Sequence, residues 1–308
     1  MSIFHSQSAR AALLAAPVLL LAAPMAHAHG FAGSRFFPAT LTIDDPFVAD
    51  ELSLPTISQS KEDDVTETEY AFEFSKRITS TLGISIEDGY SHLHGGVDAS
   101  GFGNIETTLK YQAIKDDDGE GVLSLGLSAE WGGTGAERVE AERQNTFTPT
   151  IYFGKGFGAW SKGTDWWRAF AITGVAGYAM PDRAKTGSFP DIEHHVPSFE
   201  LGTAIEYSLP YLHANVQDIG LPQWANQITP LVEISASIPQ SDRFGDRTTG
   251  TINPGLIWSG QSMQVSAEAV FPINGDSGKT VGFAVQLHFY LDDIFPDSLG
   301  KPLLGDGA

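Results

Sequence analysis

The 308-residue chain contains no cysteine, which excludes a disulfide framework, a thiol nucleophile and a cysteine-based zinc site. Basic residues are also scarce, because 18 Lys and Arg stand against 38 Asp and Glu, for a formal charge of −20. Nucleic-acid binding depends on clustered Lys and Arg, so this composition argues against a nucleic-acid partner. Beyond residue 28 no apolar run is long enough to span a bilayer as a helix. The mature chain is therefore expected to be either soluble in an exported compartment or a membrane barrel.

The N-terminal region predicts a secretory signal peptide. Arg10 precedes an apolar run that reaches Ala26, and Ala26-His27-Ala28 is a small-x-small cleavage signature. We expect cleavage after Ala28, which gives a mature start at His29. A membrane-anchoring helix is the alternative, but the run is short and interrupted by two prolines.

The segment Thr280–Leu291 has the alternation of a β-strand. Large apolar or aromatic residues occupy every second position from Val281 to Leu291, and small or hydrogen-bonding residues occupy the positions between them. A transmembrane barrel strand needs this division between a lipid-facing and a lumen-facing side. A soluble sandwich strand would show the same pattern, so the choice depends on how the rest of the chain repeats it.

The same alternation recurs along most of the chain. Candidate strands lie at 52–59, 67–75, 78–88, 104–115, 122–131, 148–157, 166–180, 197–209, 228–238, 249–258, 262–271 and 280–291. Long linkers tend to alternate with short ones, as in a barrel with short turns at one end and long loops at the other. The sequence therefore predicts an all-β fold, a closed antiparallel transmembrane β-barrel of about 12 strands.

Four parts of the chain follow from this reading. We predict a signal peptide at 1–28, a periplasmic lead-in at 29–51, the transmembrane β-barrel at 52–291 and a periplasmic tail at 292–308. The lead-in could form a periplasmic tail or fold into the mouth of the barrel.

Charged residues of the candidate strands lie opposite the bulky apolar residues of the same strand. They are Glu73, Glu106, Lys110, Glu130, Glu200, Glu206, Glu233 and Glu268. A carboxylate against hydrocarbon would cost several kcal/mol, so we expect all of these side chains to face the lumen. The solvent face of a soluble sandwich is the alternative, but such faces usually carry more lysine. A lumen with many carboxylates would favour cations over anions.

Candidate chemistry elsewhere is weak. His92, His94, His194 and His195 form two short clusters in predicted loops on the same outer side, and they are more simply surface histidines than a metal site. The sequence has no Gly-x-Ser-x-Gly motif, and no Ser and His share a strand in a triad-like arrangement. We therefore expect no catalytic residue, no cofactor and no enzymatic activity.

Several short motifs resemble those of a known group. They are Phe74-Ser75-Lys76-Arg77-Ile78-Thr79, Gly101-Phe102-Gly103-Asn104-Ile105 followed by Leu109-Lys110-Tyr111, and Pro230-Leu231-Val232-Glu233. With these motifs the chain, from about Tyr70 to Leu291, resembles bacterial outer-membrane β-barrels described as transporters of the phenol-degradation meta-pathway type. The resemblance implies a barrel with a transport role and no established catalytic residues.

The leading functional hypothesis is a channel or transporter for a small solute, either apolar and aromatic or cationic, in the outer membrane of a Gram-negative bacterium. Its expected partners are outer-membrane lipid and lipopolysaccharide, the barrel-assembly machinery and the solute. The main alternative is a structural or partner-binding barrel of an exported assembly without transport activity. A membrane-embedded enzyme is a third possibility.

Overall fold

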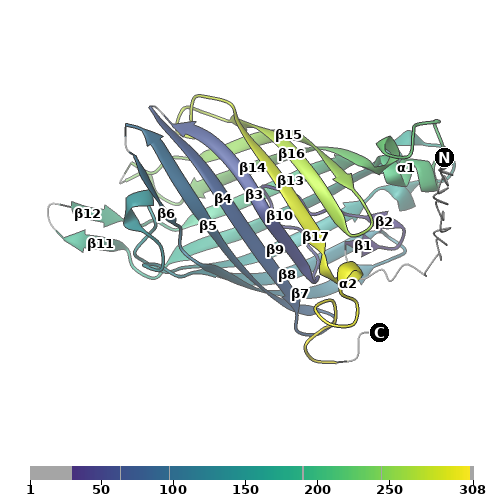
Figure 1. The fold of residues 1–308 in the computed structure, drawn as a ribbon, viewed down its shortest axis with the longest axis horizontal. Helices are drawn as coiled ribbons and strands as arrows, with labels where there is room; N and C mark the ends of the chain where they lie inside the picture. The colour runs from purple at the N-terminus through teal and green to yellow at the C-terminus, as the bar shows by residue number, and fades with distance from the viewer. Residues whose placement is uncertain (1–29, 63, 97, 189–190, 244, 306–308) are drawn as a thin grey trace, which may run out of the picture.

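The computed structural model describes residues 30–305 except 63, 97, 189–190 and 244, so the predicted signal peptide and His29 lie outside the described residues. One antiparallel sheet dominates the fold (Figure 1). Its barrel strands are β3 (Glu51–Glu62), β4 (Val65–Arg77), β5 (Leu82–Gly95), β7 (Glu106–Asp116), β8 (Gly121–Glu130), β9 (Thr146–Gly156), β10 (Phe170–Pro181), β13 (Ser198–Tyr207), β14 (Ile228–Pro239), β15 (Thr249–Ser259), β16 (Met263–Pro272) and β17 (Gly282–Tyr290). Each strand pairs with its neighbours in order, and β3 closes the circle by pairing with both β4 and β17. The predicted closed barrel of about 12 strands is confirmed.

The outer surface of the barrel is apolar, as β8 illustrates. Leu125 and Leu127 are 47% and 48% exposed, whereas Ser124, which precedes Leu125 and points to the opposite face, is fully buried inside the barrel. The cross-strand partners of Leu125 are Tyr111 and Ile151, and both are equally exposed. A continuous apolar exterior around a polar interior is the arrangement of a barrel that sits in lipid, so this is an outer-membrane β-barrel.

Three predicted strand boundaries were wrong. The segment 89–103 is not a loop, because β5 continues to Gly95 and pairs with β4, and the short strand β6 (Ala99–Phe102) then folds back on it. His92 and His94 therefore lie on a strand. The strand predicted from Trp166 begins at Phe170, where pairing with Tyr207 starts. At the other end of the chain, Leu291 is buried in a helix and is not the last lipid-facing residue.

The first barrel strand is stronger than its sequence suggested. Although it contains Pro55, β3 runs over 12 residues. Its pairing with β4 shifts register between Ser53 and Thr56, so the proline falls at an irregularity in the ladder. A proline without an N–H is tolerated at such a bulge because no regular ladder bond is lost there.

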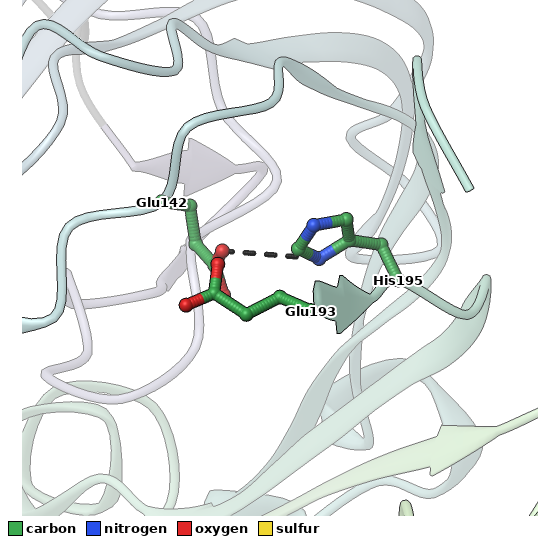
Figure 2. A group of neighbouring side chains, drawn as sticks. All are labelled: Glu142, Glu193 and His195. Atoms are coloured by element: carbon green, nitrogen blue, oxygen red, sulfur yellow. Dashed lines mark ion pairs between the residues drawn. The ribbon is translucent and has the colours of Figure 1, made fainter. Parts of the chain in front are cut away.

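The two ends of the barrel carry different elements (Figure 1). The end that we call the inner end holds α1 (Leu209–Asn215), α2 (Leu291–Ile294) and the 3₁₀ helices η2 (Gly158–Trp160), η3 (Trp166–Ala169) and η4 (Ala225–Gln227). The opposite outer end holds β6, η1 (Glu137–Val139) and a hairpin of β11 (Lys185–Ser188) and β12 (Asp191–His194). This hairpin brings Glu193 and His195 to Glu142 of the β8–β9 loop (Figure 2). Within the described residues no helix has the length and apolar character needed to cross a bilayer.

Residues 30–50, which we call the lead-in, lie inside the barrel. They begin with a small hairpin, β1 (Phe31–Ala32) and β2 (Arg35–Phe36). Three apolar residues of the lead-in, Ala32, Phe37 and Phe47, are buried against Val122 and Ala171 of the barrel wall. This apolar cluster fixes the lead-in within the lumen.

Candidate functional site

The lumen is divided into two cavities by the lead-in. The larger cavity has a volume of about 550 Å³; most of its wall residues come from β3, β4, β5, β7 and β17, and a few come from β8, β9, β14, β15 and β16. The smaller, of about 320 Å³, is lined by β9, β10, β13, β14 and the start of β15. Thr42, Ile43 and Asp44 line both cavities. The lead-in therefore crosses the lumen and narrows the path between its two halves.

Carboxylates dominate the wall of the larger cavity. Its lining includes the acidic residues Asp44, Asp45, Glu51, Glu69, Glu73, Glu87 and Glu106, against the single lysine Lys110. Such a lining raises the local concentration of cations and repels anions.

Four of the lumen glutamates form a continuous row across neighbouring strands. Glu73 on β4 is the direct cross-strand partner of Glu87 on β5, Glu87 is the partner of Glu106 on β7, and Glu106 is the partner of Glu130 on β8. Directly opposed residues have Cβ atoms about 5 Å apart, and like charges at that spacing repel. We call this set the carboxylate row.

Among the described residues, no lysine or arginine lies within ion-pair distance of the carboxylate row, and Lys110 of the same cavity is paired with Asp44. Glu73 accepts a hydrogen bond from Ser75 at 2.9 Å, Glu106 accepts one from Thr108 at 3.4 Å, and Glu130 accepts one from Asn104 at 2.9 Å. In the part of the chain that the structure describes, no ion pair joins these residues or Glu87 to a lysine or arginine. The row is therefore an arrangement that a passing cation would stabilise.

Glu233 on β14 anchors the middle of the lead-in. Its carboxylate accepts hydrogen bonds from three successive backbone N–H groups, at 3.2 Å from Leu41, 3.0 Å from Thr42 and 3.1 Å from Ile43. Glu233 is completely buried, and these bonds satisfy its charge in place of water. Glu233 therefore holds the constriction in place, whereas the glutamates of the carboxylate row face the lumen.

Lys110 on β7 holds the next part of the lead-in. Its ammonium group donates to Asp44 Oδ1 and to the backbone carbonyl of Asp45, both at 2.8 Å, and lies 4.7 Å from the ring centre of Tyr152. Phe47 N–H in turn donates to the Asp45 carboxylate at 2.7 Å. Burial raises the pKa of Asp45 to about 7, although Lys110 opposes the shift.

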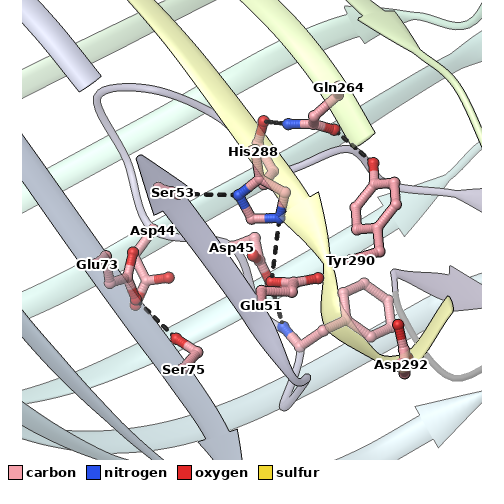
Figure 3. Close-up of polar contacts among 12 residues, drawn as sticks. Asp44, Asp45, Glu51, Ser53, Glu73, Ser75, Gln264, His288, Tyr290 and Asp292 are labelled. Carbon is pink, nitrogen blue, oxygen red and sulfur yellow. Dashed lines mark hydrogen bonds and ion pairs between the residues drawn. The ribbon is translucent and has the colours of Figure 1, made fainter. Parts of the chain in front are cut away.

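A second polar cluster lies where β17 meets β3 (Figure 3). His288 Nδ1 is 2.9 Å from Ser53 Oγ, and His288 Nε2 is 3.5 Å from the Glu51 carboxylate. On the same strand, Tyr290 donates its hydroxyl to Gln264 at 2.7 Å. Gln264 donates to the Ala39 carbonyl at 2.6 Å, so this cluster also reaches the lead-in.

The hairpin of the lead-in is fixed at the inner end by a buried network. Arg35 is fully buried, donates to the carbonyl groups of Arg168 and Ala169 at 2.5 and 3.1 Å, and lies 3.5 Å from Glu120. Its guanidinium group stacks 3.6 Å from the ring centre of Tyr211 on α1. Tyr211 donates to Glu120 at 2.6 Å, and burial together with that bond raises the pKa of the tyrosine.

The C-terminal segment closes against the start of the barrel. Asp50 is fully buried and accepts from Lys76 Nζ and Arg77 Nε, both at 2.7 Å. The same two basic side chains donate to the backbone carbonyls of Leu299, Gly300 and Lys301. The residues at the end of β4 thus connect the lead-in to the tail.

The remaining predicted lumen glutamates lie in separate places. Glu200 lines the smaller cavity and accepts from Ser237 at 2.8 Å. Glu206 is 1% exposed and accepts from Thr173 at 3.3 Å, whereas Glu268 accepts from Thr42 of the lead-in at 3.3 Å. The structure therefore brings Glu73, Glu106 and Glu130 together and distributes the others along the lead-in and the second cavity.

Sequence reasoning missed Glu87, Asp44, Arg35 and Glu120. The alternation of Ile84 and Ile86 with polar residues would have placed Glu87 on the inner face. The other three depend on the path of the lead-in through the barrel, for which the sequence carries no periodic signal.

No protein-family model matches the sequence, and no curated protein matches it. Among solved structures, an outer-membrane channel from Pseudomonas putida F1 is similar, with a TM-score of 0.55 and 12% identity over 83% of this chain and 99% of the channel. The NanC porin gives a TM-score of 0.49 and 11% identity over 78% of this chain and 98% of its own. The KdgM porin gives a TM-score of 0.46 and 12% identity over 76% of this chain and 97% of its own. At these identities the likeness to the Pseudomonas channel shows a shared barrel fold and does not identify a solute.

Proposed function

We propose that this protein is a channel of the Gram-negative outer membrane that passes small cationic solutes. The observation that carries the proposal is the carboxylate row, in which Glu73, Glu87, Glu106 and Glu130 are direct neighbours and form no ion pair with a lysine or arginine among the described residues. A ring or row of carboxylates in a water-filled passage selects cations. The lead-in acts as the internal constriction that limits flux.

The channel has further expected features. The N-terminal 28 residues direct export, the inner end faces the periplasm, and the barrel-assembly machinery inserts the chain among outer-membrane lipid and lipopolysaccharide. The barrel acts without catalysis. Because the resemblance to transporters of the phenol-degradation meta-pathway type rests on short motifs, the cationic preference is argued from the lumen and not from that group.

Reversal potentials in planar bilayers test the proposal. Under a KCl gradient the wild-type barrel should conduct, and its reversal potential should have the sign expected for a cation-selective channel. The double variant Glu87→Gln, Glu106→Gln keeps the side-chain volume and removes two charges, so the reversal potential should move toward zero. Glu140→Gln, which removes one charge from an outer loop, is the matched control and should leave selectivity unchanged.

The same experiment separates the channel from a purely structural barrel. A folded wild-type barrel that carries no current, and still carries none when the lead-in is loosened by Lys110→Met, would favour the structural role. Anion selectivity, or selectivity unaltered in the double variant, would remove the carboxylate row from the mechanism.

A further inference from the structure

The outer end of the barrel brings together three metal-ligating side chains from two separate segments, the β8–β9 loop and the β11–β12 hairpin (Figure 2). Glu142 belongs to the β8–β9 loop, Glu193 lies on β12, and His195 directly follows that strand. Their ligand atoms all lie within 4.8 Å of one another, and this is the one such group of three among the described residues. The site is independent of the lumen.

The hydrogen bonds of His195 direct one ring nitrogen toward the two carboxylates. The imidazole is only 7% exposed, and its Nε2 is 2.8 Å from Thr186 Oγ1. Thr186 donates its hydroxyl proton to Glu193 at 3.2 Å, so its oxygen accepts from Nε2–H. Nδ1 lies 3.8 Å from Glu142 Oε2, and in a metal-bound imidazole it would be the ligating nitrogen. A ring nitrogen that faces two carboxylates, with a hydrogen bond at the second nitrogen, is the arrangement typical of metal-ligating histidine.

An unsatisfied buried amide lies at the same carboxylate. Gln144 is 3% exposed, and its Nε2 donates to Glu142 Oε2 at 3.0 Å. Its Oε1 has no hydrogen-bond partner among the described residues. Rotation of the amide would place this oxygen beside Glu142 as a further ligand. A buried carbonyl oxygen without a partner is costly, so in the rotated amide a cation beside Glu142 would give that oxygen a partner.

The loop that carries Glu142 and Gln144 is held in place at its base. Gly132 N–H donates to Asn145 Oδ1 at 3.1 Å, and Asn145 Nδ2 donates to Asp182 Oδ2 at 2.8 Å. Gly132 also approaches the Gln144 backbone so closely that a Cβ there would collide with the Gln144 carbonyl oxygen. The two segments that supply the ligands are therefore positioned relative to each other without the ion.

We propose that His195, Glu142 and Glu193 bind a divalent transition-metal ion of the zinc class at the outer end of the barrel. One imidazole and two carboxylates are a ligand set that Zn²⁺ accepts, with a fourth position left for water or for Gln144 Oε1. Ca²⁺ and Mg²⁺ prefer oxygen ligands throughout, so an imidazole in the set disfavours them. The ion joins the β11–β12 hairpin to the β8–β9 loop.

The other histidine pair lacks these features. The rings of His92 and His94 stack 6.5 Å apart, and His94 forms an exposed ion pair with Asp98 at 2.9 Å. In the described part of the chain no third metal-ligating group joins them within the same limits. This pair provides an internal control.

Zinc titration of the folded, detergent-solubilised barrel after chelator treatment tests the proposal. Wild-type protein should bind one Zn²⁺ in competition with a fluorescent chelator. His195→Ala and Glu193→Gln should each weaken binding at least about tenfold. The matched controls His94→Ala and Glu140→Gln should bind as wild type. The ligands lie outside the barrel wall, so every variant should still fold. Heat-dependent gel mobility checks this.

Limited trypsin digestion gives a second readout. Zn²⁺ should slow cleavage at Arg183 and Lys185, at the start of the hairpin, in wild type and not in His195→Ala. Absence of saturable zinc binding would overturn the proposal. Binding that survives in His195→Ala but is lost in His94→Ala would overturn it as well.

Discussion

Lys110 on the barrel wall and Asp44 on the lead-in form an ion pair at 2.8 Å across the lumen. The pair lies where the lead-in separates the two cavities, so it should set how firmly the constriction is held. We expect Lys110→Met to increase single-channel conductance, because the variant releases Asp44 and also removes the one lysine from the larger cavity. Cation selectivity should rise for the second reason. Planar-bilayer recordings measure both quantities.

Lys162→Met is the control for this prediction, since Lys162 lies between η2 and η3 at the inner end and does not line either cavity. It should conduct as wild type. A Lys110→Met channel with unchanged or lower conductance would show that the ion pair does not restrain the lead-in.

Conductance should also depend on pH through Asp45. The docked carboxyl has a pKa of about 7, against an ordinary value of 3.8, with burial as the main cause and Glu51 and Asp44 adding to the shift against Lys110. A raised pKa means that the docked state holds the proton more tightly. Docking of the lead-in is therefore strongest below about pH 4 and weakens as the pH rises toward 7, by up to about tenfold per pH unit.

The comparison is conductance at pH 5 and pH 7.5. Wild type should conduct more at pH 7.5, and Asp45→Asn should lose part of that difference because its side chain does not titrate. Glu87→Gln does not alter the lead-in, so this variant should keep the part of the conductance difference between pH 5 and pH 7.5 that Asp45 contributes. Conductance that falls with rising pH would contradict the assignment.

The barrel could be predicted from the sequence because its signal is local. A strand in a membrane barrel must alternate with a period of two whatever its neighbours are, so Leu125 and Leu127 identify their face without any knowledge of pairing. The inward phase of Glu73, Glu106 and Glu130 follows from the same rule.

The alignment of those glutamates could not be predicted in this way. It requires Glu87 to stand opposite both Glu73 and Glu106, and that register is set by the length of the 78–81 turn and by the pairing of β5 with β7. The sequence left two positions open for the lead-in and could not choose between them, because Asp44 and Lys110 meet only through tertiary structure. The boundaries of β5 and β10 were missed since pairing with neighbours, not local pattern, decides where a strand ends.

The orientation of the wall gives a direct test of the membrane assignment. Leu125 faces outward at the middle of β8 and is 47% exposed, whereas Thr150, the cross-strand partner of the adjacent Gly126, lines the smaller cavity. Leu125→Lys should lower the free energy of unfolding in lipid vesicles by about 2–4 kcal/mol, the cost of a lysine facing the bilayer midplane. Thr150→Lys places the same charge in the lumen and should cost far less. Urea titrations followed by tryptophan fluorescence give both values, and equal costs would contradict a lipid-facing Leu125.

The buried pair of Arg35 and Glu120 should be strongly coupled. Arg35→Met removes the guanidinium group and leaves the Glu120 charge buried, with Tyr211 and the Gly158 N–H as its remaining donors. Breaking a buried pair from one side costs about 3–5 kcal/mol.

Glu120→Gln alone leaves Arg35 without its counter-charge and should also destabilise the docked hairpin. The double variant leaves neither charge, so its loss should be clearly smaller than the sum of the two single losses. Chymotrypsin cleavage at Phe37, which is 1% exposed while the hairpin is docked, reports the equilibrium in each variant. Strictly additive losses would show that Arg35 is held by its bonds to the Arg168 and Ala169 carbonyls and that Glu120 contributes nothing to its position.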